Sequence, residues 1–316
     1  MQYKTLGNTG LKVSVLGFGA SPLGNEFRQT TEEEGKRAVD LAIDRGINYF
    51  DTSPFYGRTL SEERLGKFLE GQRDKVIVAT KCGRYDSHTF DFSRERTMLS
   101  IDESLRRLRT DHVDVLQAHD IEFRDMNQVI DETIPAMLKI KESGKARFIG
   151  VTSLQLKVMV RAAQAHPIDT VLTYCRYNLM ITDMDELLTP AAKEKGLGLI
   201  NASPLHMRIL TEAGAPDWHP APESVKRAGG KVVAICREAG ADPADVALRF
   251  CIGHPDVATT LVGMSRPDHV ENNIRGIETP VDPELLRKIA EAVEPVKNTS
   301  WASGRLENCD YDYAEA

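Results

Sequence analysis

Short apolar segments alternate with amphipathic helical segments along the whole chain, and this alternation constrains the fold more than any other feature. Parallel strands need long crossover connections, which helices usually supply. The apolar runs predict strands at Ser14–Gly17, Asn48–Asp51, Val76–Lys81, Val113–His119, Phe148–Thr152, Val171–Tyr174, Gly198–Ala202 and Thr259–Gly263. Helical periodicity is present at Glu32–Arg45, Ser61–Glu70, Arg94–Leu108, Asn127–Ser143, Leu156–Ala165, Asp185–Lys195, Ala244–Cys251 and Pro267–Arg275. The repeat predicts an α/β fold, a (β/α)₈ TIM barrel in which residues 1–316 form a single domain.

A doubly wound sheet is the competing architecture. Such a sheet normally has fewer repeats and a glycine-rich phosphate fingerprint after its first strand. Gly17, Gly19 and Gly24 lie in that region, but their spacing differs from G-x-G-x-x-G and no helix begins directly after them. We therefore interpret this segment as a tight loop that lines a pocket.

Long loops and the last residues depart from the simple alternation. The segment Pro204–Lys231 is rich in Pro, Gly and Ala, and loops of that length in compact domains are often functional lids. The residues after Pro295 have no clear periodicity, yet they include Trp301 and Tyr311, so we expect this tail to cross the barrel mouth. Asp310-Tyr311-Asp312 is interpreted as a plain acidic tail.

In a barrel, substrate specificity is carried by the loops after the strands. Asn25, Tyr85 and Asp120 are loop residues that could bond a substrate.

The composition excludes several classes of protein. A net charge of −7 argues against binding to a nucleic-acid backbone. No run approaches the roughly 18 apolar residues that a membrane span needs, and the first residues lack the apolar core of a secretory signal. Neither the histidines nor the cysteines have metal-ligand spacing, so no metal is expected. Five scattered cysteines without a C-x-x-C pair indicate reduced thiols and therefore a cytoplasmic protein.

Four polar residues stand at or just after the ends of successive predicted strands: Asp51, Tyr56, Lys81 and His119. The strand ends of a parallel barrel meet at one face, where active sites form. A tyrosine, with an ordinary pKa near 10, works as an acid–base at neutral pH when a nearby cation stabilises its phenolate. Lys81 can be that cation, Asp51 can hold it, and His119 can orient a substrate oxygen. Each residue alone also has a structural interpretation, such as a cap, a surface charge or a packed ring. Their joint placement favours a proton-transfer site.

These residues and the phrases around them resemble the aldo-keto reductase superfamily. The similar phrases are LGNTGLKVSVLGFGASPLG, GINYFDTSPFYGRTLSEERLGKFL, VIVATKCG, SIDESLRRLRTDHVDVLQAHD, GKARFIGVTS, ASPL and GMSRPDHVENN. FGASPLGNEF, YCRYNLM, INASPL and VKNTSWASG are similar to phrases of its L-galactose dehydrogenase and D-threo-aldose (L-fucose) 1-dehydrogenase group. The resemblance implies a barrel that binds a nicotinamide cofactor. It also implies that Tyr56 is the acid–base, that Lys81 and Asp51 tune it, and that His119 contacts the substrate oxygen.

The resemblance also implies where the cofactor binds. By position, the carboxamide contacts are Thr152, Ser153 and Tyr174, the pyrophosphate contacts are Ser203, Pro204 and Leu205, and the adenosine contacts are Gly263, Met264, Ser265, His269, Asn272 and Asn273. Ser153 replaces the usual asparagine, and Tyr174 replaces a common glutamine. Ala202 stands where most reductases have an aromatic residue that stacks on the nicotinamide, as it does in the sugar-dehydrogenase group.

The cofactor and substrate follow from the same resemblance. NADPH-selective relatives often carry Lys or Arg at the positions of Met264 and His269 to pair with the 2′-phosphate. Neither residue has a fixed charge here, although Arg266 lies between them, so we expect NAD rather than NADP. The expected reaction oxidises the C1 hydroxyl of a sugar such as L-galactose or L-fucose to the lactone. The alternatives are an NADPH-dependent general aldehyde or ketone reductase and a nicotinamide-binding, redox-sensing regulatory subunit.

Overall fold

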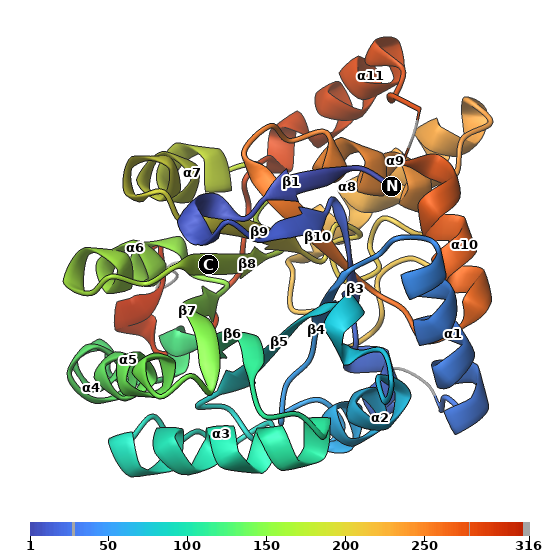
Figure 1. The fold of residues 1–316 in the computed structure, drawn as a ribbon. Helices are drawn as coiled ribbons and strands as arrows, with labels where there is room; N and C mark the ends of the chain where they lie inside the picture. The colour runs from blue at the N-terminus through green and yellow to red at the C-terminus, as the bar shows by residue number, and fades with distance from the viewer. Residues whose placement is uncertain (27–28, 278, 312–316) are drawn as a thin grey trace.

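Parallel strands form a closed barrel at the centre of the computed structural model, which describes residues 1–26, 29–277 and 279–311 (Figure 1). The strands follow the order β10-β3-β4-β5-β6-β7-β8-β9 around the barrel. They are β3 (Leu16–Gly19), β4 (Tyr49–Asp51), β5 (Ile77–Cys82), β6 (Val113–Ala118), β7 (Ala146–Ser153), β8 (Thr170–Tyr174), β9 (Gly198–Ala202) and β10 (Val257–Gly263). The closed ring confirms the predicted (β/α)₈ barrel.

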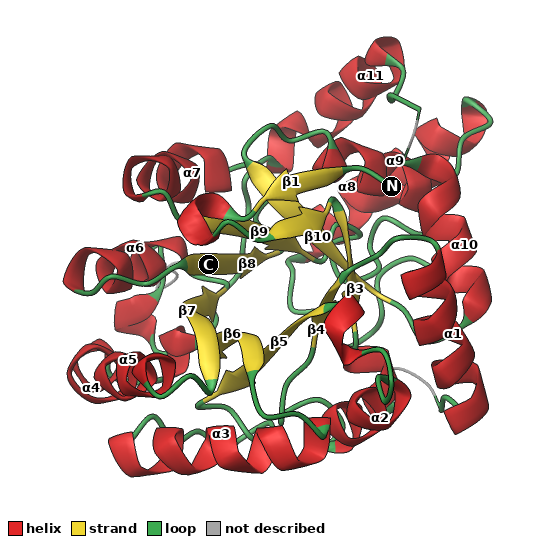
Figure 2. Ribbon diagram, in the orientation of Figure 1, coloured by secondary structure: helices red, strands yellow, loops and turns green. Residues whose placement is uncertain are grey.

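Helices surround this barrel and separate it from solvent (Figure 2). They are α1 (Glu32–Asp44), α2 (Leu60–Phe68), α3 (Arg94–Leu108), α5 (Ile134–Glu142), α6 (Leu156–Ala165), α7 (Met184–Lys195), α9 (Pro243–Ile252) and α10 (Pro267–Gly276). Most of them bury an apolar stripe, as their periodicity predicts, whereas α10 buries Val270 and packs on α1 and α9. Local sequence fixes their ends. Asp242 accepts hydrogen bonds from the first backbone N–H groups of α9, and Pro243 occupies the first turn.

The start of the chain differs from the prediction. β1 (Tyr3–Thr5) and β2 (Lys12–Ser14) form an antiparallel hairpin outside the barrel, at the N-terminal ends of its strands. Ser14 pairs with Tyr3 in this hairpin, so the first barrel strand begins only at Leu16, and the predicted strand Ser14–Gly17 is displaced. Val13 and Leu16 belong to different strands although they sit in one apolar run, which is why the sequence pattern merged them.

Three further differences concern helices. Helix α8 (Glu223–Glu238) begins inside the segment Pro204–Lys231, so the predicted long loop ends at Pro222. Gly229 and Gly230 obscured its periodicity, although Gly229 is needed because a Cβ there would collide with Ile209. Helix α11 (Pro283–Val293), not predicted from the sequence, packs on α8. The predicted helix Asn127–Ser143 is divided by a π-helical turn, Val129–Thr133, between α4 (Met126–Gln128) and α5.

The C-terminal tail packs on the face where the barrel strands end. The Trp301 ring lies edge-on to His206 and His219 of the loop after β9. The carboxylate of Asp310 accepts hydrogen bonds from two N–H groups at the start of α6 and pairs with Arg176. The tail is therefore docked by specific contacts, and the interpretation of Asp310 as part of a plain acidic tail is wrong; Asp312 lies outside the described residues.

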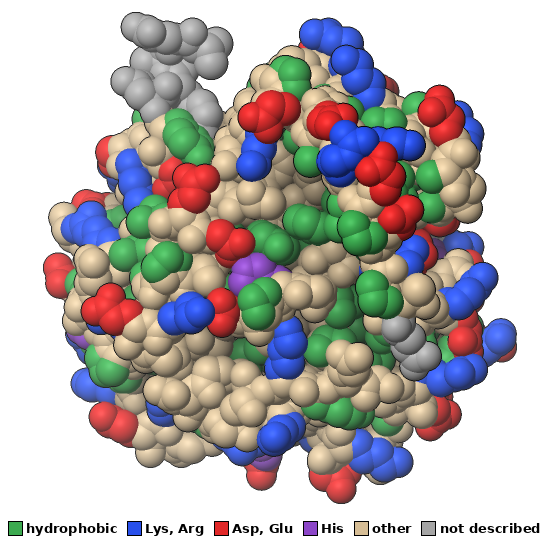
Figure 3. Space-filling view, turned by 90° about the horizontal axis from the view of Figure 1, so that it is seen from above, with side chains coloured by type: hydrophobic (Ala, Val, Ile, Leu, Met, Phe, Trp, Pro, Cys, Tyr) green, Lys and Arg blue, Asp and Glu red, His purple; other side chains and the backbone are tan. Residues whose placement is uncertain are grey.

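Acidic and basic side chains are interspersed on the face drawn in Figure 3. This mixture matches the modest net charge and offers no broad basic area there for a nucleic-acid backbone. Among the helices in the described ranges, none combines the length and the apolar character that crossing a membrane demands.

Candidate active site

The four predicted catalytic residues come together at the C-terminal ends of three neighbouring strands. Asp51 ends β4, Lys81 lies near the end of β5, and His119 directly follows β6. Tyr56 is in the loop after β4. Because β4, β5 and β6 pair in parallel, their ends reach the same level of the barrel. The four residues, although far apart in the sequence, therefore lie in one cluster.

Lys81 is the centre of this cluster and is only 1% exposed. Its Nζ forms an ion pair with Asp51 Oδ1 and donates to the carbonyl oxygen of Thr52 at 2.8 Å and to the Tyr56 hydroxyl at 3.3 Å. The other Asp51 oxygen accepts from Gln117 Nε2 at 3.0 Å. All three ammonium protons thus have partners, and the lysine is fixed beside the tyrosine.

Burial and charge act in opposite directions on these groups. Burial raises the pKa of Tyr56, and the nearby Lys81 charge opposes the rise without cancelling it. Burial alone would lower the pKa of Lys81, but Asp51 and Tyr56 outweigh it and the pKa of Lys81 is raised. At neutral pH, Lys81 is therefore a cation and Tyr56 is a protonated acid whose phenolate has a cation ready to stabilise it.

His119 is held as a neutral imidazole. Its Nδ1 lies 3.0 Å from Ser53 Oγ, and that oxygen already accepts the backbone N–H of Phe55 at 3.1 Å. The Ser53 hydroxyl can therefore donate to Nδ1, and in that tautomer the imidazole proton is on Nε2, the nitrogen that lies 3.8 Å from Asp120 Oδ2. Burial, followed by Lys81 and Arg84, holds the pKa of His119 well below its usual value. The His119 and Tyr56 rings meet edge to face, with centroids 5.7 Å apart. Nε2–H is thus a neutral donor next to the phenol.

An ion pair that sequence reasoning missed borders this cluster. Asp120 pairs with Arg84 of the loop after β5, and Asp120 Oδ2 lies 3.8 Å from His119 Nε2. Asp120 was predicted as a loop residue that could bond a substrate, but its pairing with Arg84 was not predicted, and Arg84 was not singled out. No local pattern could have joined them, since 36 residues separate them in the chain. Ser53 was also missed, although its place in the Asp-Thr-Ser phrase was a visible signal.

Comparison with known proteins identifies the family of the chain. Residues 15–294 match the Aldo/keto reductase family. The chain belongs to this family. It is 46% identical to L-galactose dehydrogenase from Arabidopsis thaliana over 98% of this chain and 99% of that protein. It is 30% identical to D-threo-aldose 1-dehydrogenase from a Pseudomonas species, over 90% of this chain and 95% of the relative.

A solved structure gives the same fold. The holo form of an aldo-keto reductase from Bacillus halodurans superposes with a TM-score of 0.79 at 28% sequence identity, covering 96% of this chain and 99% of that one. The protein is therefore an oxidoreductase of a family that uses nicotinamide cofactors.

Two predicted carboxamide contacts of this aldo/keto reductase have hydroxyls that already bond within the protein. Thr152 Oγ1 accepts the backbone N–H of Asp120 at 3.0 Å. Ser153 Oγ donates to Glu122 at 2.7 Å and accepts the N–H of Gln155 at 2.9 Å. Both residues are buried and hold the loop after β6 in place. Tyr174, the third predicted contact, is half-buried at the end of β8.

The segments after β9 and β10 have features that fit a nucleotide cofactor. Ser203 adopts a positive φ of 58°, and its neighbours Pro204 and Leu205 begin the loop towards α8. Gly263 is exposed at the end of β10, where a Cβ would approach the Pro22 ring to 3.0 Å. Ser265 Oγ is buried and has no hydrogen-bond partner among the described residues. A buried, unsatisfied hydroxyl next to a glycine suits a polar ligand that lies close to the backbone.

In the segment predicted to contact adenosine, residues 263–273, some side chains are oriented differently from the expectation. The Met264 side chain is fully buried in the hydrophobic core, so it does not face a 2′-phosphate. His269 Nε2 accepts from Arg266, which also pairs with Asp268 at 2.8 Å. Farther along α10, Asn272 accepts from Arg275, and Asn273 is half-buried. Arg266, not residue 264, is therefore the cation available near this segment.

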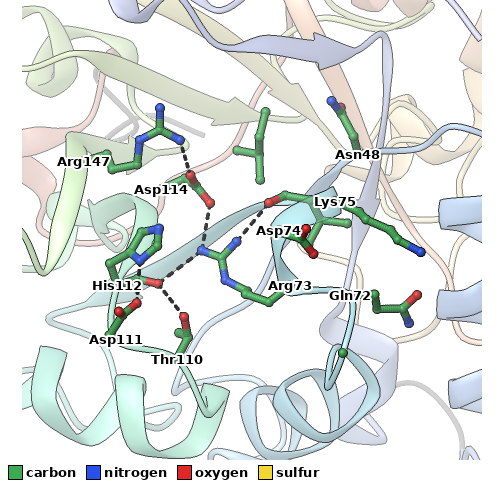
Figure 4. Close-up of a pocket in the computed structure, with 13 residues that line it drawn as sticks. Asn48, Gln72, Arg73, Asp74, Lys75, Thr110, Asp111, His112, Asp114 and Arg147 are labelled. Atoms are coloured by element: carbon green, nitrogen blue, oxygen red, sulfur yellow. Dashed lines mark hydrogen bonds and ion pairs between the residues drawn. The ribbon is translucent and has the colours of Figure 1, made fainter.

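A polar hollow of about 690 Å³ lies at the opposite end of the barrel, where the strands begin (Figure 4). Asp114 at the start of β6 accepts from the N–H of Val78 at 2.9 Å, from Arg73 at 2.9 Å and from Arg147 at 2.7 Å. These bonds join β5, β6 and β7. The hollow is thus lined by a structural network and lies away from the tetrad.

In the ranges that the structure describes, no group of His, Cys, Asp or Glu could hold a metal ion, and the absence of a metal remains a prediction.

Proposed function

We propose that this aldo/keto reductase is an NAD-linked aldose 1-dehydrogenase that oxidises the C1 hydroxyl of a cyclic sugar, such as L-galactose or L-fucose, to the lactone. The observation that carries the proposal is the Tyr56 hydroxyl, 3.3 Å from a buried, fully bonded Lys81 and beside the His119 ring. The 46% identity to an L-galactose dehydrogenase over nearly the whole chain supports the substrate class.

Each tetrad residue has a role in this reaction. His119 Nε2–H donates to the C1 oxygen, and the Tyr56 phenolate oxygen accepts the hydrogen bond of the C1 hydroxyl, so the two groups fix its position. When bound, the nicotinamide supplies the acceptor for the hydride that leaves C1. Tyr56 acts as the base that takes the proton from the C1 oxygen, and Lys81 stabilises the phenolate that this requires. Asp51 keeps the ammonium group in place. Because the pKa of Tyr56 is raised, oxidation should become faster as the pH rises into the alkaline range.

The proposed cofactor site uses Tyr174, the backbone at Thr152, Ser153, Ser203, Pro204 and Leu205, and the segment with Gly263, Ser265, His269, Asn272 and Asn273. The preference for NAD is supported by the buried Met264 and by His269, a residue without a fixed charge. Arg266 is paired with Asp268, so its positive charge is partly neutralised and attracts a 2′-phosphate less strongly. We also propose a cytoplasmic location, because Cys82, Cys175, Cys236, Cys251 and Cys309 are all free and buried.

The test is the initial rate of reduced nicotinamide formation with NAD and, separately, NADP. The sugars are L-galactose, L-fucose, D-arabinose and their epimers, with Tyr56→Phe as the inactive control. We expect rapid NAD reduction with one configurational set. NADPH-driven reduction of simple aldehydes without sugar oxidation would instead identify a general reductase. Tightly retained cofactor with no turnover in either direction would identify a redox-sensing subunit.

A further inference from the structure

The Arg84–Asp120 pair occupies a position that any substrate of the tetrad must approach. Asp120 Oδ2 lies 3.8 Å from His119 Nε2, the nitrogen that donates to the C1 oxygen in the proposed reaction. Arg84 stacks on Phe55, the neighbour of Tyr56, with its guanidinium carbon 3.9 Å from the ring centroid. The pair therefore borders both groups that hold the reacting oxygen.

The pair is held rigidly. Asp120 adopts a left-handed backbone, with φ 54° and ψ 59°, which side-chain-bearing residues rarely do. Its N–H is bonded to Thr152, and the Phe90 and Phe123 rings flank the Arg84 guanidinium at 5.2 and 5.3 Å. Such fixed geometry at a strand end is typical of a binding group.

The pair also keeps hydrogen-bonding capacity. The Arg84 side chain is 17% exposed and that of Asp120 is 4% exposed, and the buried Nε of Arg84 has no partner in the described part of the chain. The two charges neutralise each other, so the pair does not call for a charged ligand. A guanidinium offers donors and a carboxylate offers acceptors, and a sugar hydroxyl needs one of each.

We propose that Arg84 and Asp120 bind the hydroxyl on C2 of the aldose, next to the reacting C1, and so select substrates by the presence and configuration of that group. The inference rests on the proposed aldose dehydrogenase function. C2 carries the hydroxyl nearest to the reacting oxygen, and vicinal oxygens lie about one hydrogen-bond length apart. A sugar whose C1 oxygen contacts His119 Nε2 thus brings its C2 oxygen within reach of Asp120.

The other loop residues considered from the sequence have different partners. Asn25 Oδ1 accepts the N–H of Thr30 at 2.9 Å and Nη1 of Arg64 at 3.1 Å. The Tyr85 hydroxyl accepts the N–H of Gly83 at 3.2 Å. Among the three, Asp120 is the residue that borders the tetrad, which strengthens its assignment to the substrate.

The experiment compares L-galactose with 2-deoxy-L-galactose in the wild type and in Asp120→Asn. Removing the carboxylate should lower kcat/KM for L-galactose about 10- to 100-fold and leave the 2-deoxy sugar nearly unchanged. A purely structural ion pair would slow both sugars equally. Asp102→Asn, which breaks the exposed Asp102–Lys145 pair, is the matched control and should not alter the ratio.

Arg84→Lys provides a second variant that keeps a positive partner for Asp120 while losing the planar fork, so folding is less at risk. A selective loss on L-galactose, smaller than that of Asp120→Asn, is expected. Equal losses on both sugars in either folded variant would overturn the C2 assignment and leave the dehydrogenase function standing. A wild type that oxidises neither sugar but reduces simple aldehydes would overturn the proposed function and the assignment with it.

Discussion

Each end of the barrel has a buried aspartate at the end of a strand, and the two aspartates have different roles. Asp114, at the N-terminal end, bonds to a backbone N–H and to two arginines on neighbouring segments. Asp51, at the C-terminal end, bonds to Lys81 and Gln117. The same functional group joins strands at one end and fixes a lysine at the other.

The two aspartates differ in the further contacts that their cationic partners make. Arg73 and Arg147 donate to Asp114, and Arg73 also donates to backbone carbonyl oxygens. None of these acceptors passes a proton on, because arginine does not titrate near neutral pH. Lys81 continues to the Tyr56 hydroxyl, whose proton can move. In the proposed reaction, an ion pair becomes part of a proton-transfer site because its cation also contacts a titratable hydroxyl.

Tyr56→Phe tests the C-terminal end and should have the largest effect. It removes the hydroxyl that carries the proton while keeping the ring, so kcat should fall roughly 10²- to 10⁴-fold. Cofactor affinity, measured by fluorescence titration, and the melting temperature should stay close to those of the wild type. Near-normal turnover would refute the assigned role of Tyr56.

Asp114→Ala tests the N-terminal end, where the loss should appear in stability. Removing the carboxylate leaves the Val78 N–H and a largely buried Arg73 without their acceptor, at a cost of about 2–3 kcal/mol. Arg147 is half exposed and contributes little to this figure. Urea denaturation measures the change. Since the network is remote from the tetrad, kcat/KM should remain within about twofold; a large loss of activity in folded protein would break the contrast between the two ends.

Ser53→Ala tests whether the C-terminal end depends on a chosen imidazole tautomer. Without the Ser53 hydroxyl, Nδ1 of His119 loses the donor that keeps the proton on Nε2, and kcat should fall about tenfold. The ring ¹⁵N shifts of His119 report the tautomer directly, and Ser53→Thr should restore both readouts. An unchanged tautomer in Ser53→Ala would contradict the assignment.

Glu122→Gln should have the smallest effect, seen only in the pH dependence of stability. Burial, and then Asp120, raise the pKa of Glu122 from 4.5 to about 8. Between these values the folded protein retains a proton that the unfolded chain releases, so this group's contribution to stability falls as the pH rises towards 8. The amide cannot titrate. Melting curves from pH 5 to 9 should therefore show the stability of Glu122→Gln increasing relative to that of the wild type as the pH rises towards 8. Parallel pH profiles would exclude this titration.

The sequence predicted the barrel well because buried parallel strands are short apolar runs with polar ends. Asp51 and Lys81 stand where such runs finish, and the closed barrel brings them together. The first strand was displaced because two strands share one apolar run. The first residues of helix α8 were assigned to a loop because Gly229 and Gly230 weaken the helical pattern, although the structure needs a glycine at 229.

The surroundings of the tetrad were harder to predict, for a physical reason. The Arg84–Asp120 pair, the Ser53–His119 bond and the burial of Met264 depend on how segments pack across the barrel. A pattern along the chain gives the direction of a side chain in a regular strand or helix. It does not give the direction in the loops after strands, where Asp120 takes a left-handed backbone.

Buried Arg176 has one carboxylate partner seven residues away, Asp183, and a second 134 residues away, Asp310. During synthesis on the ribosome, Asp183 emerges with Arg176 and can neutralise it at once, long before Asp310 exists. Asp183 therefore neutralises the buried guanidinium whether or not the tail is docked. Docking of the tail adds a second carboxylate to a charge that already has a partner.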